Sequence, residues 1–371
     1  MNTQIDTSWL ITGAGAVAAI GRNVSDLFES LCAGRTGVAE IERFGTGDFR
    51  TRHGYPMADS VPETPAFATR LLIRAVAEAL AQAGIDDATG IPIVVGTGLR
   101  ELRSVELAWQ SGAGRPDLDF GPALRRRFGC TEVHTVSNAC AASLHALAMA
   151  ADLLALDRAD TVVVAGVDTI ALSMFAALDL VQPPMDRLRP FDARHKGVLM
   201  GDGAAAIVVS RGGAPRAVLR GVGMNCDAGH VTAPDPVGIV AAMHDAHRRA
   251  AVRPADVDLV LAHGTGTALN DAAEASALTE VFGADQPVVT AIKAMTGHTS
   301  GSSGLLSVVA AVESLRTGMV PVIPDLAVPI AEARELRLAT EPADPAHLRV
   351  AQVNSFGFGG VNAVAIVERA A

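Results

Sequence analysis

The chain has 371 residues, of which 49% are hydrophobic and only 4% aromatic, and its formal net charge is −10 at pH 7. An acidic chain lacks the dominant basic face that nucleic-acid binding requires, so we exclude nucleic acid as its main partner. The four cysteines lie far apart without a C-x-x-C pair, which argues against a zinc site and a disulfide framework. The N-terminal residues have no basic or apolar signal region, and we expect no membrane span and a cytoplasmic location.

The first predicted element is a buried strand over residues 8–17 that runs into a glycine turn, followed by a helix over 24–33. Gly13, Gly15 and Ala18 match the G-x-G-x-x-A spacing of dinucleotide-binding turns. No second strand with an acidic ribose ligand follows at the required distance of about 20 residues. A tight strand-to-helix turn is therefore the better interpretation of these glycines.

An amphipathic helix is predicted from Pro65 to Gly84, and a strand follows at residues 91–98. The next stretch, from Val133 to Ala150, combines a short β-rich run, a turn and an apolar helical pattern, so that Cys140 falls where a strand turns into a buried helix. The free N–H groups and the positive dipole end of such a helix favour a thiolate and can bind an oxyanion. Cys140 is therefore a candidate nucleophile, although a small buried cysteine without chemistry fits the same stretch.

The sequence also repeats itself. Residues 91–98 are echoed by 258–266, and residues 123–129 by 277–283, in the same order. We infer two related halves, residues 1–211 and 212–371. The second echo pairs Cys140 with position 294 and predicts that the two corresponding corners meet in one central site. Four further apolar runs read as strands of buried sheets, at residues 161–168, 204–210, 217–224 and 350–368.

Three more glycine-rich clusters follow predicted strands in the second half. One contains His263, another contains Lys293 and His298, and the third runs from Asn354 to Asn362. A single histidine in such a turn is as readily a satisfied structural group as a base or hydrogen-bond donor. Two histidines and a cysteine at the corners of a duplicated fold are better explained as one catalytic site.

Together these motifs resemble the β-ketoacyl synthases, which are decarboxylating condensing enzymes of the thiolase superfamily in fatty-acid and polyketide synthesis. The resemblance implies an α/β, thiolase-like, five-layered αβαβα fold made of two duplicated halves. An enzyme of this family needs no metal and no cofactor beyond the phosphopantetheine that carries the substrates. The matching segments, in family order, are SNACAAS (137–143), RPFDARHKGVLMGDGAA (189–205), CDAGHVTAP (226–234), AHGTGTALNDAAE (262–274), IKAMTGH (292–298) and NSFGFGGVNA (354–363).

The resemblance assigns the chemistry to six residues. Cys140 takes an acyl group from a carrier-protein thioester, and the backbone N–H groups of Cys140 and Phe358 form the oxyanion hole. His263 and His298 then donate hydrogen bonds to the thioester oxygen of a malonyl group while carbon dioxide leaves. Lys293, paired with Glu274, supports the geometry and electrostatics of the site, although an ordinary buried ion pair is the alternative.

The resemblance also implies the residues that bind and admit substrate. Thr265 and Thr267 match residues that contact the phosphopantetheine arm, and Phe356 belongs to the same substrate-binding set. Phe358 matches a gating side chain, which the flanking glycines Gly357 and Gly359 allow to move.

The implied partners are an acyl carrier protein and a second ketosynthase-like subunit, in a homodimer or heterodimer. Carrier proteins are acidic, so a basic docking patch is expected, either Arg70 with Arg74 or the run 125–127. Two alternatives stay open: an acyltransferase that passes the acyl-Cys140 group to an alcohol or amine, and a chain-length-determining partner subunit. The chain is shorter than most of the family over 100–130 and 171–190, so its acyl substrate, extender and carrier do not follow. These departures favour a specialised pathway.

Overall fold

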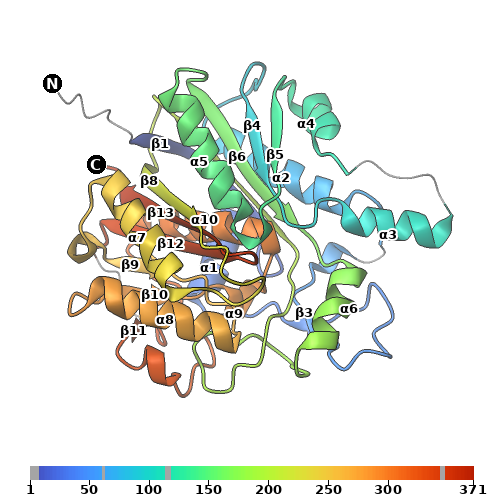
Figure 1. The fold of residues 1–371 in the computed structure, drawn as a ribbon. Coiled ribbons are helices and arrows are strands. Elements are labelled where there is room, and N and C mark those ends of the chain that lie inside the picture. The colour runs from blue at the N-terminus through green and yellow to red at the C-terminus, as the bar shows by residue number, and fades with distance from the viewer. Residues whose placement is uncertain (1–7, 61–62, 113–117, 343–346) are drawn as a thin grey trace.

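In the computed structural model, residues 8–60, 63–112, 118–342 and 347–371 are described. The strands of the first half are β1 (Trp9–Ala18), β4 (Ile93–Gly96), β5 (Val133–Val136), β6 (Thr161–Asp168) and β7 (Gly203–Ser210). Those of the second half are β8 (Ala217–Cys226), β9 (Leu259–Leu261), β10 (Val288–Thr290), β11 (Arg337–Leu338), β12 (Val350–Gly357) and β13 (Val361–Arg369). They form one sheet of 11 strands in the order β11-β10-β9-β12-β13-β8-β1-β7-β6-β4-β5 (Figure 1).

The two halves of this sheet repeat one topology. Leaving aside the two-residue edge strand β11, the first half reads β5-β4-β6-β7-β1 from its outer edge and the second reads β10-β9-β12-β13-β8. In each half the first two pairings from this edge are parallel and the last two are antiparallel. A short antiparallel contact between β1 and β8 joins the halves. The predicted echoes therefore lie at corresponding places, because residues 91–98 contain β4 and residues 258–266 contain β9.

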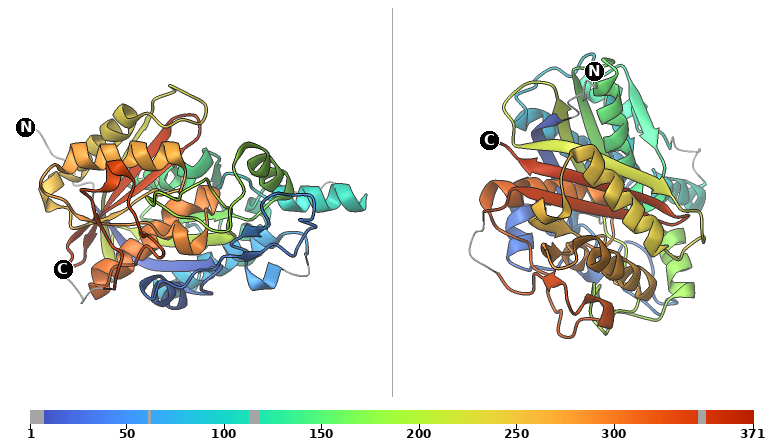
Figure 2. Two further views of the ribbon diagram at one scale, coloured as in Figure 1. Left: turned by 90° about the horizontal axis from the view of Figure 1, so that it is seen from below. Right: turned by 60° about the vertical axis from the view of Figure 1, so that its left-hand side comes forward.

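Helices cover and separate the two half-sheets. The long ones are α2 (Phe67–Gln82), α5 (Ala142–Ala155), α7 (Pro236–Ala250), α8 (Ala268–Phe282) and α10 (Ser303–Thr317). One apolar cluster packs α2 on the first half-sheet, another packs α7 and α8 on the second, and the largest surrounds α5 and α10 between them. Figure 2 shows these layers from two further sides. The predicted five-layered α/β fold is thus present.

Shorter elements complete the described chain. The helices are α1 (Val24–Cys32), α3 (Leu102–Ser111), α4 (Gly121–Phe128), α6 (Leu172–Val181) and α9 (Lys293–Thr296), and β2 (Ala39–Glu40) pairs with β3 (His53–Gly54). The 3₁₀ turns are η1 (Ala58–Ser60), η2 (Ala139–Ala141), η3 (Pro254–Asp256), η4 (Ser300–Ser302) and η5 (Ala331–Ala333). Within the described ranges no helix is long and apolar enough to cross a membrane. Residues 113–117, inside the shortened 100–130 region, lie outside the described residues.

The glycine turn predicted in the first strand is wrong. β1 continues through Gly13 and Gly15, and the chain turns only at Ala18–Gly21. A Cβ at Gly13 would lie 2.1 Å from the carbonyl oxygen of Ala79, and one at Gly15 would lie 2.0 Å from that of Ala75. Both glycines therefore serve close packing of β1 against α2 rather than a turn or a nucleotide.

The pairing of Cys140 with position 294 is also wrong. In the first half η2 leads directly into α5, and in the second half η4 leads directly into α10. The first residue of each turn has the same unusual backbone, with φ 47° at Ala139 and 46° at Ser300. The structural counterpart of Cys140 is thus Gly301. The repeat misaligned because residues 291–299, which include α9, have no counterpart of similar length before η2.

Candidate active site

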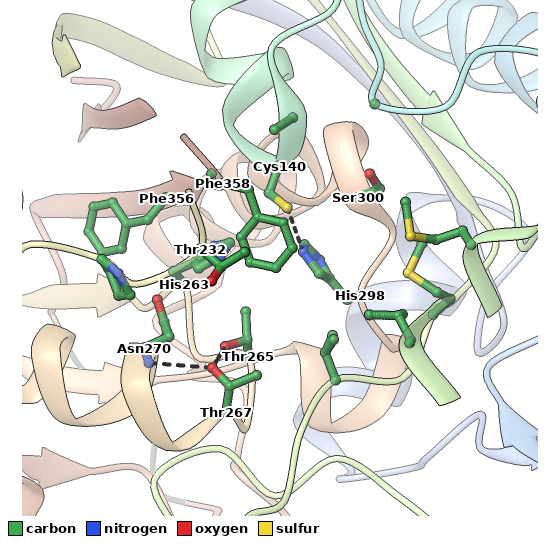
Figure 3. Close-up of a pocket in the computed structure, with 18 of the residues that line it drawn as sticks. Cys140, Thr232, His263, Thr265, Thr267, Asn270, His298, Ser300, Phe356 and Phe358 are labelled. Carbon is green, nitrogen blue, oxygen red and sulfur yellow. Dashed lines mark hydrogen bonds between the residues drawn. The ribbon is translucent and has the colours of Figure 1, made fainter. Parts of the chain in front are cut away.

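A cavity of about 200 Å³ lies where the η2 and η4 corners meet. Figure 3 shows Cys140, His263, His298 and Phe358 converging on it from different elements. Lys293, Glu274 and Gly359 lie behind or beside the cavity rather than in its wall. The predicted site residues that line it are Cys140, His263, Thr265, Thr267, His298, Phe356, Gly357 and Phe358.

The turn that carries Cys140 is held tightly against β12. The Ser355 hydroxyl donates to the Cys140 carbonyl over 2.9 Å. A Cβ at Gly357 would lie 3.2 Å from the Ala139 side chain and 3.3 Å from the Cys140 nitrogen, so glycine allows β12 this close approach. The positive φ of Ala139 aims the next residue out of the turn and into the cavity, as at other strained strand-to-helix nucleophile turns.

The expected thiolate at this helix start is not supported by the electrostatics. Burial raises the pKa of Cys140 to about 11, and the negative charge of Asp168 adds to that rise. Lys293 and the backbone N–H groups of Cys140 and Phe358 oppose it, which places both predicted oxyanion-hole donors beside the sulfur. Desolvation outweighs the helix dipole here, so Cys140 is a thiol at neutral pH and requires a proton acceptor.

His298 supplies that acceptor. Its Nε2 lies 3.0 Å from the Cys140 Sγ, while its Nδ1 is buried and has no hydrogen-bond partner among the described residues. Burial, and then the charge of Lys293, hold the pKa of His298 well below its ordinary value. The ring is therefore neutral. While Nε2 accepts from the thiol, the ring proton is on Nδ1, and no partner of Nδ1 among the described residues holds it there.

His263 is restrained differently. Its Nδ1 lies 3.4 Å from the Lys293 Nζ, and the same Nζ donates to the His263 carbonyl oxygen. With a pKa of about 8, Lys293 is mainly an ammonium at neutral pH. An ammonium can only donate, so Nδ1 is unprotonated and the proton of the neutral ring is on Nε2. Burial, Lys293 and His298 all lower the pKa of His263. The ring also packs edge-on against Phe356 and His298, with centroids 5.6 and 5.5 Å away.

The predicted pairing of Lys293 with Glu274 is present as a charge interaction, since the Glu274 carboxylate opposes the fall of the Lys293 pKa, but not as a contact. Within the described residues these side chains form no ion pair; both act on His263 instead. Glu274 accepts the backbone N–H groups of His263 and Gly264 at 2.7 and 2.8 Å, and the amide of Asn354 at 3.0 Å. Burial raises the pKa of Glu274, which these donors oppose, and burial lowers that of Lys293 to about 8.

The cavity has a polar side and an apolar side. The hydroxyls of Thr265 and Thr267 lie 2.9 Å apart, and Thr267 also caps α8 by accepting the N–H of Asn270. Sequence reasoning missed the whole apolar side. Met174 and Leu178 come from the shortened 171–190 region, whereas Val198 and Met200 lie in the matching segment 189–205 but are apolar residues without a chemical signal. The residues that line this side are Leu99, Met174, Leu178, Val198 and Met200.

Phe358 lies at the mouth of the cavity with 56% of its surface exposed. The two residues that follow are glycines with φ of 87° and 77°, a backbone region that side-chain-bearing residues rarely adopt. The Gly359 N–H donates to the Val231 carbonyl over 2.8 Å. A bulky, exposed ring on such a loop fits the predicted gate.

Asp168 joins the two halves behind the cavity and was not predicted. Its carboxylate accepts the Gly301 N–H at 2.7 Å, the N–H groups of Gly98 and Leu99 at 2.7 and 2.8 Å, and the Thr97 hydroxyl at 2.8 Å. Burial raises its pKa to about 6. The carboxylate therefore fixes the η4 corner to the end of β4.

In the described part of the chain no group of three metal-binding side chains is present.

Known families and proteins match this chain. Residues 129–213 match the family model described as Beta-ketoacyl synthase, N-terminal domain, and residues 216–326 match Beta-ketoacyl synthase, C-terminal domain. Nodulation protein E of Rhizobium meliloti is 33% identical over 330 residues, which are 79% of this chain and 80% of that protein. 3-Oxoacyl-[acyl-carrier-protein] synthase 2 of Coxiella burnetii is 28% identical over 407 residues, 97% and 98% of the two chains.

A solved structure supports the same fold. The ishigamide ketosynthase/chain length factor superposes with a TM-score of 0.89 and 26% identity, covering 98% of this chain and 99% of the other. The similarity therefore extends over both half-sheets and the corners between them.

Proposed function

The chain belongs to the β-ketoacyl synthase family and is a condensing acyltransferase that forms carbon–carbon bonds, and we propose that Cys140, His263 and His298 carry its reaction. The reaction is a decarboxylative Claisen condensation of a malonyl-carrier thioester with an acyl group held on Cys140. The observation that carries this assignment is the meeting of a thiol with two differently restrained neutral imidazoles.

In the first step His298 Nε2 takes the Cys140 proton as the sulfur attacks the acyl thioester. The carbonyl oxygen becomes an oxyanion between the N–H groups of Cys140 and Phe358. The tetrahedral intermediate expels the carrier thiol, which leaves with the proton, and the acyl group stays on Cys140. The 3.0 Å Nε2–Sγ distance supports this proton transfer.

In the second step a malonyl thioester loses carbon dioxide, and its electron pair passes to the thioester oxygen as an enolate. His263 stabilises that oxygen through the Nε2–H that Lys293 imposes, and the His298 ring donates to it as well. The enolate carbon then attacks the acyl-Cys140 carbonyl and displaces the sulfur as a thiolate, giving a β-ketoacyl thioester. The thiolate takes up one proton from solvent, which restores the Cys140 thiol. Glu274 and Lys293 position His263 through its backbone and Nδ1.

The two alternatives are less well supported. An acyltransferase acting on alcohols or amines would need only one base, which His298 supplies. The fixed N–H donor of His263 is left without a role in that reaction, whereas it suits an enolate oxygen. A chain-length-determining subunit has no use for a cysteine, whereas Cys140 faces His298 in the wall of the cavity. Purification as an active homodimer would refute the second alternative.

The cavity supports a specialised rather than a long-chain substrate range. Its volume of about 200 Å³ lies below the ~300–1,000 Å³ of ordinary ligand pockets. We expect short acyl groups against Met174, Leu178 and Met200, in polyketide or fatty-acid-like synthesis. Efficient elongation of long-chain acyl groups would contradict this part of the proposal.

The proposal includes an acyl carrier protein as substrate carrier and a dimer with a second ketosynthase-like subunit. One structural neighbour is described as a ketosynthase/chain length factor, and one relative as an acyl-carrier-protein synthase. Thr265 and Thr267, at the polar side of the cavity, would contact the phosphopantetheine arm.

A cytoplasmic location, where thiols stay reduced, suits the free Cys140. The repeated strand order supports a division into residues 1–211 and 212–371.

Intact-mass analysis of wild type and Cys140→Ala tests the proposal directly. Each protein is incubated with acyl thioesters and then with malonyl-carrier protein while carbon dioxide is recorded. We expect an acyl adduct on wild type only, at least about a thousandfold faster than on the variant, and its discharge with carbon dioxide as a β-ketoacyl product. An acyl adduct that malonyl-carrier protein does not discharge would favour the acyltransferase. The absence of any adduct across a panel of acyl thioesters would favour the partner subunit.

A further inference from the structure

A file of buried polar side chains lies behind the active site. His247 of α7 and the β12 residues Gln352 and Asn354 are 4%, 0% and 1% exposed. His247 Nε2 lies 2.7 Å from Gln352 Oε1, Gln352 Nε2 lies 2.8 Å from Asn354 Oδ1, and Asn354 Nδ2 lies 3.0 Å from Glu274 Oε1. The file therefore runs from the outer helix layer to the carboxylate that holds the backbone of His263.

The direction of every hydrogen bond in this file is fixed from the Glu274 end. A carboxylate only accepts, so Asn354 must turn its NH₂ group toward Glu274 and its oxygen toward Gln352. Gln352 must then donate its own NH₂ group to Asn354, which leaves its oxygen facing α7. His247 must donate to that oxygen through Nε2–H. All the donors point toward the catalytic centre, an arrangement in which each bond polarises the next.

Packing alone does not explain this file. It crosses the apolar cluster between α7, α8 and the second half-sheet, and the His247 ring packs edge-on against Phe282 with centroids 5.9 Å apart. His247 Nδ1 is buried there without a partner among the described residues, and burial lowers the pKa of His247. Apolar side chains of similar volume would fill the same space without a buried unpaired nitrogen.

From these contacts we infer that His247 and Gln352 are positioning residues for the condensation step, acting through Asn354 and Glu274 on the backbone of His263. Without the Gln352 donor, the Asn354 amide is free to turn its oxygen toward Glu274. Two acceptors then face each other, Glu274 shifts from the His263 N–H, and the imidazole leaves the enolate position. His298 lies between α9 and η4, and within the described chain no hydrogen bond joins its side chain to the file, so Cys140 acylation stays intact.

This inference rests on the proposed function, and its test separates the two half-reactions in the full chain. Gln352→Leu and His247→Phe break the file at different links. His244→Phe is the matched control, because His244 is exposed on the same helix, and His247→Gln keeps an N–H donor. Acyl-Cys140 formation is followed by intact mass, and carbon dioxide release from malonyl-carrier protein is followed on the acylated enzymes.

We expect Gln352→Leu and His247→Phe to slow carbon dioxide release about tenfold or more while acylation changes less than about twofold, because only the placement of His263 is lost. His247→Gln should recover most of the rate, and His244→Phe should match wild type. Equal slowing of both half-reactions, no slowing of either, or failure of both file variants to fold would overturn the inference. If wild type forms no adduct or releases no carbon dioxide, the proposed function fails and this inference fails with it.

Discussion

The two strand-to-helix corners of this molecule have the same backbone conformation but present different side chains to the cavity. η2 and η4 begin with residues at nearly the same positive φ, and each leads into a helix of the central layer. The first corner presents Cys140, and the second presents Gly301 at the corresponding place. The second corner has instead an added segment, residues 291–299, that brings Lys293 and His298 to the sulfur of the first.

In the mechanism we propose, this difference divides one reaction between the two halves of a duplicated fold. The first corner keeps the short connection, so its helix start and backbone donors surround a nucleophile. The second corner has a glycine at position 301, which lets its backbone pack against Thr97 and Gly98 just after β4. The added segment carries Lys293 and the proposed proton acceptor, His298. Neither corner is a complete active site without the other.

The largest expected effect comes from removing the histidines of the second half one at a time. We expect His298→Ala to slow acyl-Cys140 formation by about 10²–10⁴-fold, because the thiol loses its proton acceptor. His263→Ala should leave acylation nearly unchanged and slow carbon dioxide release by a similar factor. The measurements are intact-mass and carbon dioxide time courses. Identical losses in both half-reactions for both variants would contradict this division of roles.

Lys293 lies on the segment that only the second corner has, and it should make the free energy of unfolding depend on pH. Burial lowers its pKa from 10.5 to about 8. Between these pH values the unfolded chain binds more protons, so the free energy of unfolding rises with pH, by up to about 3 kcal/mol from this group. The buried Cys140 thiol, with a pKa of about 11, gives the opposite slope above about pH 9.

Urea unfolding of proteins with and without Lys293→Met from pH 7.5 to 9.5 isolates the lysine. Because Lys293 lowers the Cys140 pKa, both proteins carry Cys140→Ala so that only the lysine differs. The free energy of unfolding with Lys293 minus that with Met should then increase with pH. A difference that stays flat over this range would show that Lys293 does not titrate there.

Gly301→Ala tests whether the second corner can accommodate a Cβ at the place where the first corner has Cys140. A Cβ at Gly301 would lie 2.5 Å from the Gly98 nitrogen and 2.6 Å from the Thr97 carbonyl carbon. We expect the free energy of unfolding to fall by about 1–3 kcal/mol in urea titrations, because backbone atoms of both halves must separate. Gly47→Ala is the control, since a Cβ at Gly47 meets nothing within 4 Å; equal effects of the two changes would refute the close packing.

The smallest effect is expected outside the corners, on α4, where Arg125 and Arg126 are exposed. Charge reversal of both to Glu should lower kcat/KM for carrier-bound acyl groups by about tenfold at low salt, because an acidic carrier would be repelled. The effect should shrink at high salt and vanish with a free thioester substrate. An unchanged rate with carrier-bound substrate at low salt would exclude this patch as the docking surface.

The sequence by itself determined where each chemical group stands along the chain. The strand-to-helix change at Cys140 and the glycine-rich turns around His263 and His298 are local patterns, and the echoes between residues 91–98 and 258–266 revealed the duplication. These predictions succeeded because periodicity and turn chemistry depend on neighbours in the chain.

Only the tertiary structure decided how these groups act on one another. Lys293 contacts His263 rather than Glu274, Cys140 corresponds to Gly301, and the Cys140 pKa rises instead of falling. Each result depends on distances between segments far apart in sequence and on the water that their packing excludes. Desolvation and through-space contacts have no signature in a local pattern. For that reason the file from His247 to Glu274 emerged only when α7 and β12 were seen together.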